Sequence, residues 1–314
     1  LFNADGTVGI VFNGEIYNFQ SLRTELEALG HVFRTRSDTE VIVQAWMAWG
    51  PACVHRLRGM FAFAIWDQTQ QTLFMARDRM GVKPLHYALL PDGTLVFGSE
   101  LKVITAHPGF ERQIDPQAVE DYFALGYVPD PRCIYRQAHK LPPAHTLTWR
   151  RGQVGQPTPQ PYWDVHFTLD NPISLADAEA ELRERVRESV RLRMIADVPL
   201  GAFLSGGVDS SAVVATMAGL SKLPVRTCAI GFDDPQFNES AFAQMVADRY
   251  HTDHRLEIVQ SDDFDLIDTL ARLYDEPFAD SSALPTYRVC QMARKHVTVA
   301  LSGDGGDESL GGYR

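Results

Sequence analysis

The sequence predicts two folds in succession: an α+β domain of layered antiparallel sheets and helices, then an α/β domain built on a parallel sheet. In residues 1 to about 105, short apolar or alternating runs are separated by Gly, Asp and Pro turns, a pattern typical of antiparallel strands. Farther along, apolar runs alternate with helical patterns, which indicates a parallel sheet with helices on both faces. A chain of 314 residues with 45% hydrophobic composition can bury both cores.

The first domain is expected at residues 1–150. Strand patterns lie at 8–12, 61–66, 73–76 and 95–97, and helical periodicity covers 20–29 and 40–49. Residues 151–172 are rich in Gly and Pro and are therefore expected to form a linker. Within it, Tyr162 and Trp163 are expected to pack back on a domain as an anchor.

The second domain, expected at residues 173–314, starts with an amphipathic helix in which Leu182, Val186, Val190 and Met194 recur every four residues. Strands are expected at 198–203, 225–232, 254–259 and 297–301, with helices at 211–218, 239–250 and 262–274. Ligands of parallel sheets bind beyond the carboxyl ends of the strands. Three distinctive sequences fall there: Ser205-Gly-Gly207, Ile230-Gly-Phe-Asp233 and Ser302-Gly-Asp-Gly-Gly-Asp-Glu308.

The first of these sequences has the features of a phosphate-binding loop. Residues 204–211 read Leu-Ser-Gly-Gly-Val-Asp-Ser-Ser, so a buried strand stops at a glycine pair and a helix follows. Backbone N–H groups and a helix N-terminus then surround one point, which suits pyrophosphate. A Walker loop needs a Lys that is absent here, and the segment instead resembles the PP-loop of ATP pyrophosphatases. A Gly-rich turn without a ligand is the alternative.

The third sequence places Asp304, Asp307 and Glu308 within five residues on a glycine-rich turn. Like charges this close repel unless a cation neutralises them, and oxygen ligands beside phosphate suit Mg²⁺. Taken alone, such a cluster is usually a solvated turn. Together with Asp209 of the phosphate loop, it predicts a metal-nucleotide site.

In the first domain, one segment has the donors of an oxyanion site. The side chain of Asn13 and the amide of Gly14 can both direct N–H groups at one position, as the oxyanion of an acyl-transfer intermediate requires. By itself Asn-Gly is only a turn signal. The functional interpretation therefore depends on what surrounds it.

Several motifs occur together in the first domain. They are Asn13-Gly-Glu-Ile-Tyr-Asn18, Ser37-Asp-Thr-Glu40, Gly59-Met-Phe-Ala-Phe-Ala64, Arg77-Asp-Arg-Met-Gly-Val-Lys-Pro84 and Phe97-Gly-Ser-Glu100. With these motifs the first domain resembles the glutaminase domain of glutamine-hydrolysing asparagine synthetases, and the second domain, with its phosphate loop and acidic turn, resembles their synthetase domain.

The resemblance implies an Ntn-hydrolase-like fold followed by a PP-loop fold of the adenine nucleotide alpha hydrolase type. Two further segments, 127–131 and 140–145, resemble the branch of this superfamily found in bacterial exopolysaccharide clusters.

The resemblance assigns roles to particular residues. Asn13 and Gly14 form the oxyanion hole, and Glu15 and Asp38 contact the bound glutamine. Asp304 acts in adenylate formation, although some family members carry the longer Glu at this position. Asp209 and Asp307 hold Mg²⁺ and pyrophosphate. The residues expected to bind ATP, with Leu204 and Ile230 lining the adenine through backbone atoms, are Leu204, Ser205, Gly206, Gly207, Asp209, Ser210, Ser211, Ile230, Ser302 and Gly303.

The implied activity is ATP-dependent and glutamine-dependent amidation of a carboxylate through an acyl-adenylate, with release of AMP, pyrophosphate and glutamate. Aspartate is the expected acceptor, and another carboxylate of exopolysaccharide or secondary metabolism is the alternative. A GMP or NAD synthetase shares the phosphate loop but lacks the Asn-Gly-Glu-Ile-Tyr-Asn segment. A protein that only senses ATP is a non-enzymatic alternative. The resemblance also allows a homodimer.

The family's nucleophile is an amino-terminal Cys, whose own α-amino group serves as the base. This chain begins with Leu1, and its four cysteines lie at positions 53, 133, 228 and 290. We therefore expect a fragment that lacks this Cys, the Arg of the glutamine loop and a downstream segment with a functional Lys. Such a fragment should not hydrolyse glutamine; a natural protein that has lost its glutaminase is the alternative.

The composition indicates which classes of partner and which cellular location to expect. Lys and Arg number 29 and Asp and Glu number 40, so the net charge is −11, and with no basic stretch alternating with aromatics we expect no nucleic-acid partner. No apolar run approaches the length of a membrane helix, so no membrane partner is expected. The unpaired cysteine spacing favours a reducing, cytoplasmic location without structural zinc.

Overall fold

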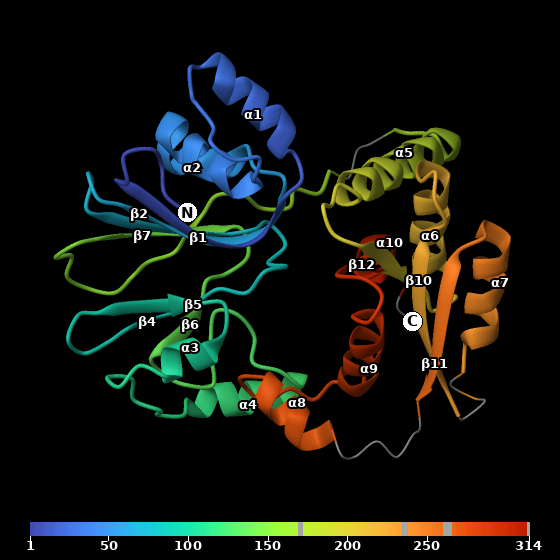
Figure 1. Cartoon of the computed structure of the whole chain (residues 1–314). Helices are drawn as coiled ribbons and strands as arrows, with labels where there is room; N and C mark the ends of the chain where they lie inside the picture. Colours follow the sequence, from blue (N-terminus) through green and yellow to red (C-terminus); the bar gives the residue numbers. More distant parts are fainter. Residues whose placement is uncertain (169–171, 234–235, 237, 260–265, 313–314) are drawn as a thin grey trace. The chain divides into compact units, whose positions relative to one another are not determined.

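The computed structural model describes residues 1–168, 172–233, 236, 238–259 and 266–312 (Figure 1). Its internal contacts divide the chain into two compact units. The first consists of Leu1–Thr168 and Leu273–Ala279, and the second of Leu169–Arg272 and Asp280–Arg314. A short segment of the later sequence therefore belongs to the first unit.

The first unit contains two antiparallel sheets. A five-stranded sheet has the order β1-β2-β3-β7-β8, and a three-stranded sheet has the order β5-β4-β6. The strands of the larger sheet are β1 (Val8–Ile16), β2 (Gly59–Asp67), β3 (Thr72–Arg77), β7 (His145–Arg150) and β8 (Gln160–Pro161). Those of the smaller sheet are β4 (His86–Leu89), β5 (Leu95–Gly98) and β6 (Ala138–Lys140).

Helices cover the outer face of each sheet, which gives four layers (Figure 1). On the larger sheet lie α1 (Phe19–Ala28), α2 (Asp38–Trp49) and the 3₁₀ turn η1 (Gly50–His55). On the smaller sheet lie α3 (Leu101–Thr105) and α4 (Pro116–Leu125). Alternation along β2 divides the interior: Phe61 and Phe63 pack under the helices, and Ala62 and Ala64 pack between the sheets. The α+β prediction for this part of the chain is confirmed.

Some elements of the first unit were not predicted from the sequence. The strands β4 and β6 and the helix α3 have four, three and five residues, and elements this short show too few periods to separate a helical from a strand pattern. The strand β7 and the helix α4 are as long as β3 and α1, which were predicted, so their length does not explain why they were missed. The predicted anchoring is confirmed for Tyr162, whose ring packs against the core and whose hydroxyl donates to the Arg77 carbonyl at 2.8 Å, whereas Trp163 is 37% exposed.

The segment Leu273–Ala279 is held in the first unit by partly buried charges. Asp275 accepts from the backbone N–H of Lys102 at 3.2 Å and pairs with its Nζ at 2.9 Å. Glu276 pairs with Lys140, and the two side chains are only 16% and 13% exposed. Glu276 also accepts from the backbone N–H of Ile134 at 3.1 Å. The first unit is therefore not one continuous stretch of the chain, because ion pairs and hydrogen bonds hold a segment that is distant in sequence.

The second unit is built on a four-stranded parallel sheet with the order β11-β10-β9-β12. Its strands are β9 (Leu200–Phe203), β10 (Arg226–Phe232), β11 (Asp253–Val259) and β12 (Val299–Leu301). Its helices are α5 (Leu175–Arg193), α6 (Val208–Leu220), α7 (Ser240–Tyr250), α8 (Ile267–Leu273), α9 (Ala283–Ala293) and α10 (Gly306–Leu310).

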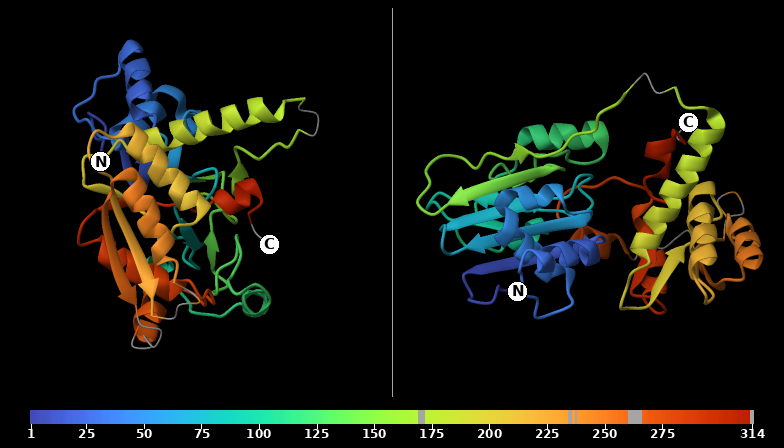
Figure 2. Two further views of the ribbon diagram at one scale, coloured as in Figure 1. Left: turned by 90° about the vertical axis from the view of Figure 1, so that its right-hand side faces the viewer. Right: turned by 90° about the horizontal axis from the view of Figure 1, so that it is seen from above.

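Helices lie on both faces of this sheet, as predicted. Val190 of α5, Val214 of α6 and Ala243 of α7 form one core with residues of β9 and β10. Met292 of α9 packs with Cys228 on the opposite face. Figure 2 shows α9 in red on one side of the sheet and α6 and α7 on the other. Cys228 of β10 is thus a core residue.

One helix of this unit begins earlier than the sequence predicts, and the start of another cannot be compared with the prediction. The helix predicted to start at Ser211 begins at Val208, because Gly207 has the extended conformation of an N-cap residue. Asp209 and Ser210 therefore lie in its first turn, where a carboxylate is favoured by the helix dipole. Of the helix predicted at 262–274, residues 262–265 lie outside the described part of the chain. Within the described residues, no helix is both long and apolar enough to cross a membrane.

Candidate functional sites

The Asn13 segment lies where two sheet edges of the first unit meet. Strand β1 is an edge of the larger sheet, and β5 is an edge of the smaller one. Side chains alternate along β1, so Phe12 and Ile16 face the core under the helices. Asn13 and Glu15 consequently share the opposite face, on the side of the second sheet.

A side-chain hydrogen bond joins the two edges. Nδ2 of Asn13 donates to Oγ of Ser99 at 3.2 Å. Ser99 directly follows β5, and its carbonyl oxygen lies 3.0 Å from Nδ1 of His86 on the neighbouring strand β4. Because a carbonyl can only accept, this ring nitrogen carries the proton and donates. An Asn amide has two N–H groups, and the bond to Ser99 uses one of them.

Gly14 is required by close backbone packing. It adopts φ of 150°, and a Cβ at this position would lie 2.1 Å from the carbonyl oxygen of Met60 on β2. Any larger residue would push β1 from its neighbour. The glycine thus permits the strand pairing that presents Asn13, independently of any role for its N–H group.

Asp38 meets the same stretch of β1 from α2. It is the first residue of α2, which Ser37 caps by accepting from the N–H of Thr39 at 3.1 Å. One carboxylate oxygen of Asp38 accepts from the backbone N–H of Ile16 at 2.9 Å. The structure therefore brings Asp38 beside the residue that follows Glu15, and so assembles the segment predicted to contact glutamine.

The nearby Glu40 has a structural function. Its buried carboxylate accepts from the backbone N–H groups of Arg34 and Thr35, at 2.8 and 2.6 Å, and from the Thr35 hydroxyl. Burial by itself would raise the pKa of Glu40, but these hydrogen bonds outweigh it and lower the pKa. Glu40 therefore fixes the loop that leads into α2 while Asp38 remains near β1.

The Arg77-Asp78 motif proves to be an anchor for the turn that follows it. Oxygens of Asp78 accept from four backbone N–H groups, including those of Val82 and Lys83 at 3.0 Å. The guanidinium of Arg77 donates to carbonyls of Lys83, Leu141 and Gly81 and to Asp130. This motif carried part of the family resemblance, yet its side chains are used to fold the chain.

In the second unit, the phosphate-loop residues form a tight turn between β9 and α6. The hydroxyls of Ser205 and Ser210 lie 3.0 Å apart, and Ser205 also accepts from the N–H of Gly207 at 3.2 Å. Gly206 has φ of 89° and lies so close to α7 that a Cβ would come within 2.6 Å of the backbone nitrogen of Ala243. The N–H of Ser211 donates to the Gly207 carbonyl at 3.0 Å, so two backbone N–H groups of the loop are satisfied within the loop itself.

The acidic turn lies directly against this loop. Strand β9 has β10 on one side and β12 on the other, so the chain order reverses between β9 and β12, where ligands of open parallel sheets bind. A Cβ on Gly303, after β12, would lie 2.8 Å from Cβ of Asp209. Gly306 packs against the carboxylate of Asp209. The structure thus brings the two predicted loops together through glycines.

The carboxylates of the acidic turn differ in their surroundings. Asp304 is exposed and accepts from the hydroxyl of Ser302 at 2.9 Å. Asp307 is half-buried in the first turn of α10, with its carboxylate against Gly312. Ile230 lies within β10, two residues before its end. The described residues contain no group of three or more His, Cys, Asp or Glu side chains arranged to hold a metal ion.

The chemistry of Asp209 nevertheless suits Mg²⁺. Its carboxylate is half-buried and lies against the backbone of Gly306 in the opposite turn. Carboxylate oxygen beside a phosphate-binding loop is the donor type that Mg²⁺ prefers. The residues present therefore fit a metal-nucleotide ligand at this point.

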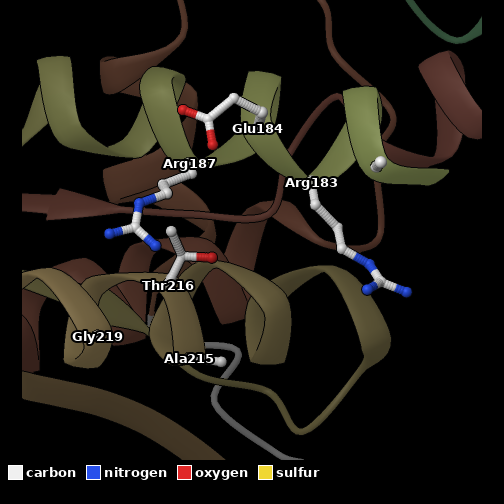
Figure 3. A pocket seen from close by; sticks show the side chains of 7 residues that line it. Arg183, Glu184, Arg187, Ala215, Thr216 and Gly219 are labelled. Carbon is white, nitrogen blue, oxygen red and sulfur yellow. The ribbon is translucent and has the colours of Figure 1, made fainter. Parts of the chain in front are cut away.

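A separate pocket of about 290 Å³ lies between α5 and α6. In Figure 3, Arg183 and Arg187 extend from α5 alongside α6, whereas Glu184 points away from it. None of the residues predicted to bind ATP lines this pocket, which includes Ala215 and Thr216 from the middle of α6. The loop at the start of α6 remains the candidate nucleotide site.

All four cysteines are free. Cys53 is fully buried, and burial raises the pKa of its thiol to about 12. A thiol with this pKa stays protonated at neutral pH and is a poor nucleophile. Burial is also the main cause that raises the pKa values of Cys133, Cys228 and Cys290.

Comparison with known proteins assigns two successive parts of the chain to two families. Residues 1–163 match the glutamine amidotransferase domain family, and residues 181–314 match the asparagine synthase family. The first unit thus defines the class, a glutamine amidotransferase domain. The chain as a whole belongs to the family of glutamine-hydrolysing asparagine synthetases.

Two relatives illustrate the similarity. The chain is 41% identical to a putative glutamine-hydrolysing asparagine synthetase 2 of Methanocaldococcus jannaschii over 97% of this chain and 58% of that protein. It is 36% identical to glutamine-hydrolysing asparagine synthetase 1 of Bacillus subtilis over 98% of this chain and 48% of that protein. The chain therefore spans about half the length of these relatives.

Among solved structures, glutamine phosphoribosylpyrophosphate amidotransferase from B. subtilis is similar with a TM-score of 0.36 and 15% identity. The match covers 91% of this chain and 52% of that chain. A likeness of this size has no bearing on function.

Proposed function

We propose that this chain is part of an enzyme that amidates a carboxylate with nitrogen from glutamine, at the expense of ATP, through an acyl-adenylate. Aspartate is the proposed acceptor, and asparagine, AMP, pyrophosphate and glutamate are the proposed products. The observation that carries the proposal is the combination of two sites in one chain. An amide donor stands at a sheet edge in an amidotransferase unit, and a PP-loop meets an acidic turn in the other unit.

In the first unit, glutamine hydrolysis passes through a tetrahedral intermediate whose oxygen carries negative charge. The second N–H of Asn13 and the N–H of Gly14 are proposed to stabilise this oxyanion, because preorganised donors need no rearrangement during the reaction. Glu15 and Asp38 are proposed to hold the bound glutamine. The half-buried position of Asp38 at the start of α2 supports this role.

In the second unit, backbone groups of the loop from Leu204 to Ser211 and of the turn at Ser302 and Gly303 are proposed to bind ATP. The N-terminus of α6 favours a bound anion, since its dipole and free N–H groups point toward it. Asp209 and Asp307 are proposed to hold Mg²⁺. When bound, the ion would neutralise charge on the departing pyrophosphate. Asp304 is proposed to act in adenylate formation.

Ammonia released from glutamine is then proposed to attack the acyl carbon of the adenylate. Ammonium is no nucleophile, and near neutral pH free ammonia is mostly protonated. Exclusion of water keeps an amine neutral and therefore reactive, because burial disfavours the charged form. A synthetase that uses free ammonia would need no Asn13 segment, so the presence of this segment favours glutamine as the donor.

The proposal is tested by assaying full-length protein with Mg-ATP, glutamine and a panel of carboxylates that includes aspartate. We expect AMP, pyrophosphate and glutamate to form together with one amide product. A heavy-oxygen label in the acceptor carboxylate should appear in AMP, because the adenylate transfers that oxygen. ADP and phosphate as products, or ATP binding without pyrophosphate release for any carboxylate, would contradict the proposal.

A further inference from the structure

Asn13 is held by a residue that lies far away in the sequence. Its amide can rotate about the last side-chain bond, and rotation would exchange the donor nitrogen for the acceptor oxygen. Only the bond from Nδ2 to Oγ of Ser99, at 3.2 Å, links this amide to another side chain among the described contacts. With one N–H directed at Ser99, the orientation of the other N–H is fixed by the planarity of the group.

Ser99 is itself held on both sides. The preceding residue, Gly98, pairs in register with His86 of β4. Two residues later, Leu101 is fully buried in the core under the smaller sheet. A Cβ on Gly98 would come within 3.0 Å of Val103, so the backbone packs closely against α3.

Two further contacts fix the backbone around Ser99. Nδ1–H of His86 donates to the Ser99 carbonyl at 3.0 Å, and His86 is only 9% exposed. Lys102 binds Asp275 through its backbone N–H at 3.2 Å and through Nζ at 2.9 Å. A hydroxyl fixed in this way can orient its partner, because a supporting group must be less mobile than the group it positions.

We propose that Ser99 is a positioning residue for glutamine hydrolysis, which aims the free N–H of Asn13 at the oxyanion. The inference rests on the proposed role of Asn13 and adds to it a specific requirement for the Ser99 hydroxyl. Ser99 does not touch the substrate in this account. Its loss therefore affects the reaction only through Asn13.

The test uses the full-length protein and glutamine hydrolysis. Ser99→Ala removes one neutral hydrogen bond, so we expect a three- to tenfold lower kcat, about the value of one such bond. The KM for glutamine should stay unchanged, because only a transition-state interaction is weakened. Ser99→Thr keeps the hydroxyl and should restore kcat, whereas Ser99→Cys, with its weak acceptor, should resemble Ser99→Ala.

A double-mutant cycle separates positioning from general stability. In the Asn13→Ala background, Ser99→Ala should cause no further loss, because the residue it positions is gone. Ser21→Ala is a matched control, since this exposed hydroxyl donates to the Asn18 carbonyl at 2.9 Å and should leave kcat unchanged. Thermal midpoints of all variants show whether each one folds, and the Thr and Cys variants retain the comparison if Ser99→Ala is unstable.

The outcomes are distinguishable. Wild-type kcat in Ser99→Ala, or an equal loss in both backgrounds, would overturn the positioning role while leaving the oxyanion assignment intact. Unchanged hydrolysis in Asn13→Ala alone would instead overturn the oxyanion assignment, and the inference about Ser99 with it. Loss confined to the Asn13-containing background would support both.

Discussion

Different groups hold the two candidate sites together: polar side chains in the first unit and closely packed glycines in the second. In the first unit, side chains connect separate elements: Asn13 of β1 bonds Ser99 after β5, and Asp38 of α2 bonds the backbone of β1. In the second unit, glycines bring two turns together, because Gly303 and Gly306 pack directly against Asp209. The first site therefore depends on polar side-chain atoms as well as on Gly14, whereas the contact between the two turns of the second site depends on the absence of side chains at Gly303 and Gly306.

This difference follows from the two kinds of sheet. Antiparallel edge strands in different layers share no backbone hydrogen bonds, so side chains must join them. Parallel strands end at the same edge of one sheet, so the loops that follow them meet without help from side chains. Each prediction below tests one side of this comparison.

The largest expected effect comes from Asp209→Asn. This change keeps the shape of the side chain but removes the charge proposed to bind Mg²⁺, so synthesis should fall by about three orders of magnitude or more. Glutamine hydrolysis in the full-length protein should be nearly unchanged, because Asp209 lies in the other unit. Amide and glutamate formation are measured side by side, with the exposed Asp197→Asn as the control. Equal loss of both activities would show that the two sites are not separate.

Asn13→Ala should have the next largest effect. Loss of one oxyanion donor costs about 3 kcal/mol, so glutamine hydrolysis should slow by about two orders of magnitude. Synthesis from added ammonia should survive, since it does not use this site. If ammonia-dependent synthesis falls as far as glutamine-dependent synthesis, Asn13 serves only the fold.

Gly303→Ala tests the glycine contact of the second site. A Cβ would lie 2.8 Å from both Cβ of Asp209 and the backbone nitrogen of Ser210, so the two turns must move apart. We expect about tenfold weaker ATP binding, or about 1.4 kcal/mol, measured by calorimetry. Gly219→Ala is the matched control, because a Cβ there meets nothing within 4 Å. An affinity loss shared by both variants would argue against a specific contact.

The smallest expected effect is the pH dependence of stability through His86. Burial lowers the pKa of His86, and the hydrogen bond to the Ser99 carbonyl opposes this only in part. Below about pH 6.5 the unfolded chain therefore binds a proton that the folded protein resists, and stability falls as pH falls. Above that pH both forms are neutral, so this contribution to the pH dependence disappears.

Denaturant midpoints measured between pH 7.5 and 5.5 would show this change in stability. The range extends about one pH unit on either side of the ordinary His pKa. His86→Asn keeps a donor for the Ser99 carbonyl but cannot titrate, so its midpoint should fall less steeply with acid. Equal slopes for the two proteins would show that His86 is not responsible.

Local pattern drew attention to the segments that form both candidate sites, and the family resemblance supplied the roles proposed for their residues. The Asn-Gly pair, the Ser-Gly-Gly-Val-Asp-Ser loop and the acidic glycine turn were all found because each motif lies within a few neighbouring residues. The order of strands and helices also predicted both fold classes, since periodicity and turn residues are properties of short segments. The start of α6 was placed three residues late because the N-cap is a glycine, which gives a weaker signal than Ser or Asp.

What the sequence could not determine depends on contacts between residues far apart in the chain. Ser99 stood within a recognised motif, yet nothing local linked it to Asn13, from which it is separated by 86 positions. The recruitment of Asp275 and Glu276 into the first unit likewise depends on Lys102 and Lys140 being brought to the same surface. Only the tertiary structure decides such pairs, because a hydrogen bond or ion pair forms wherever the packed sheets and helices bring complementary groups within reach.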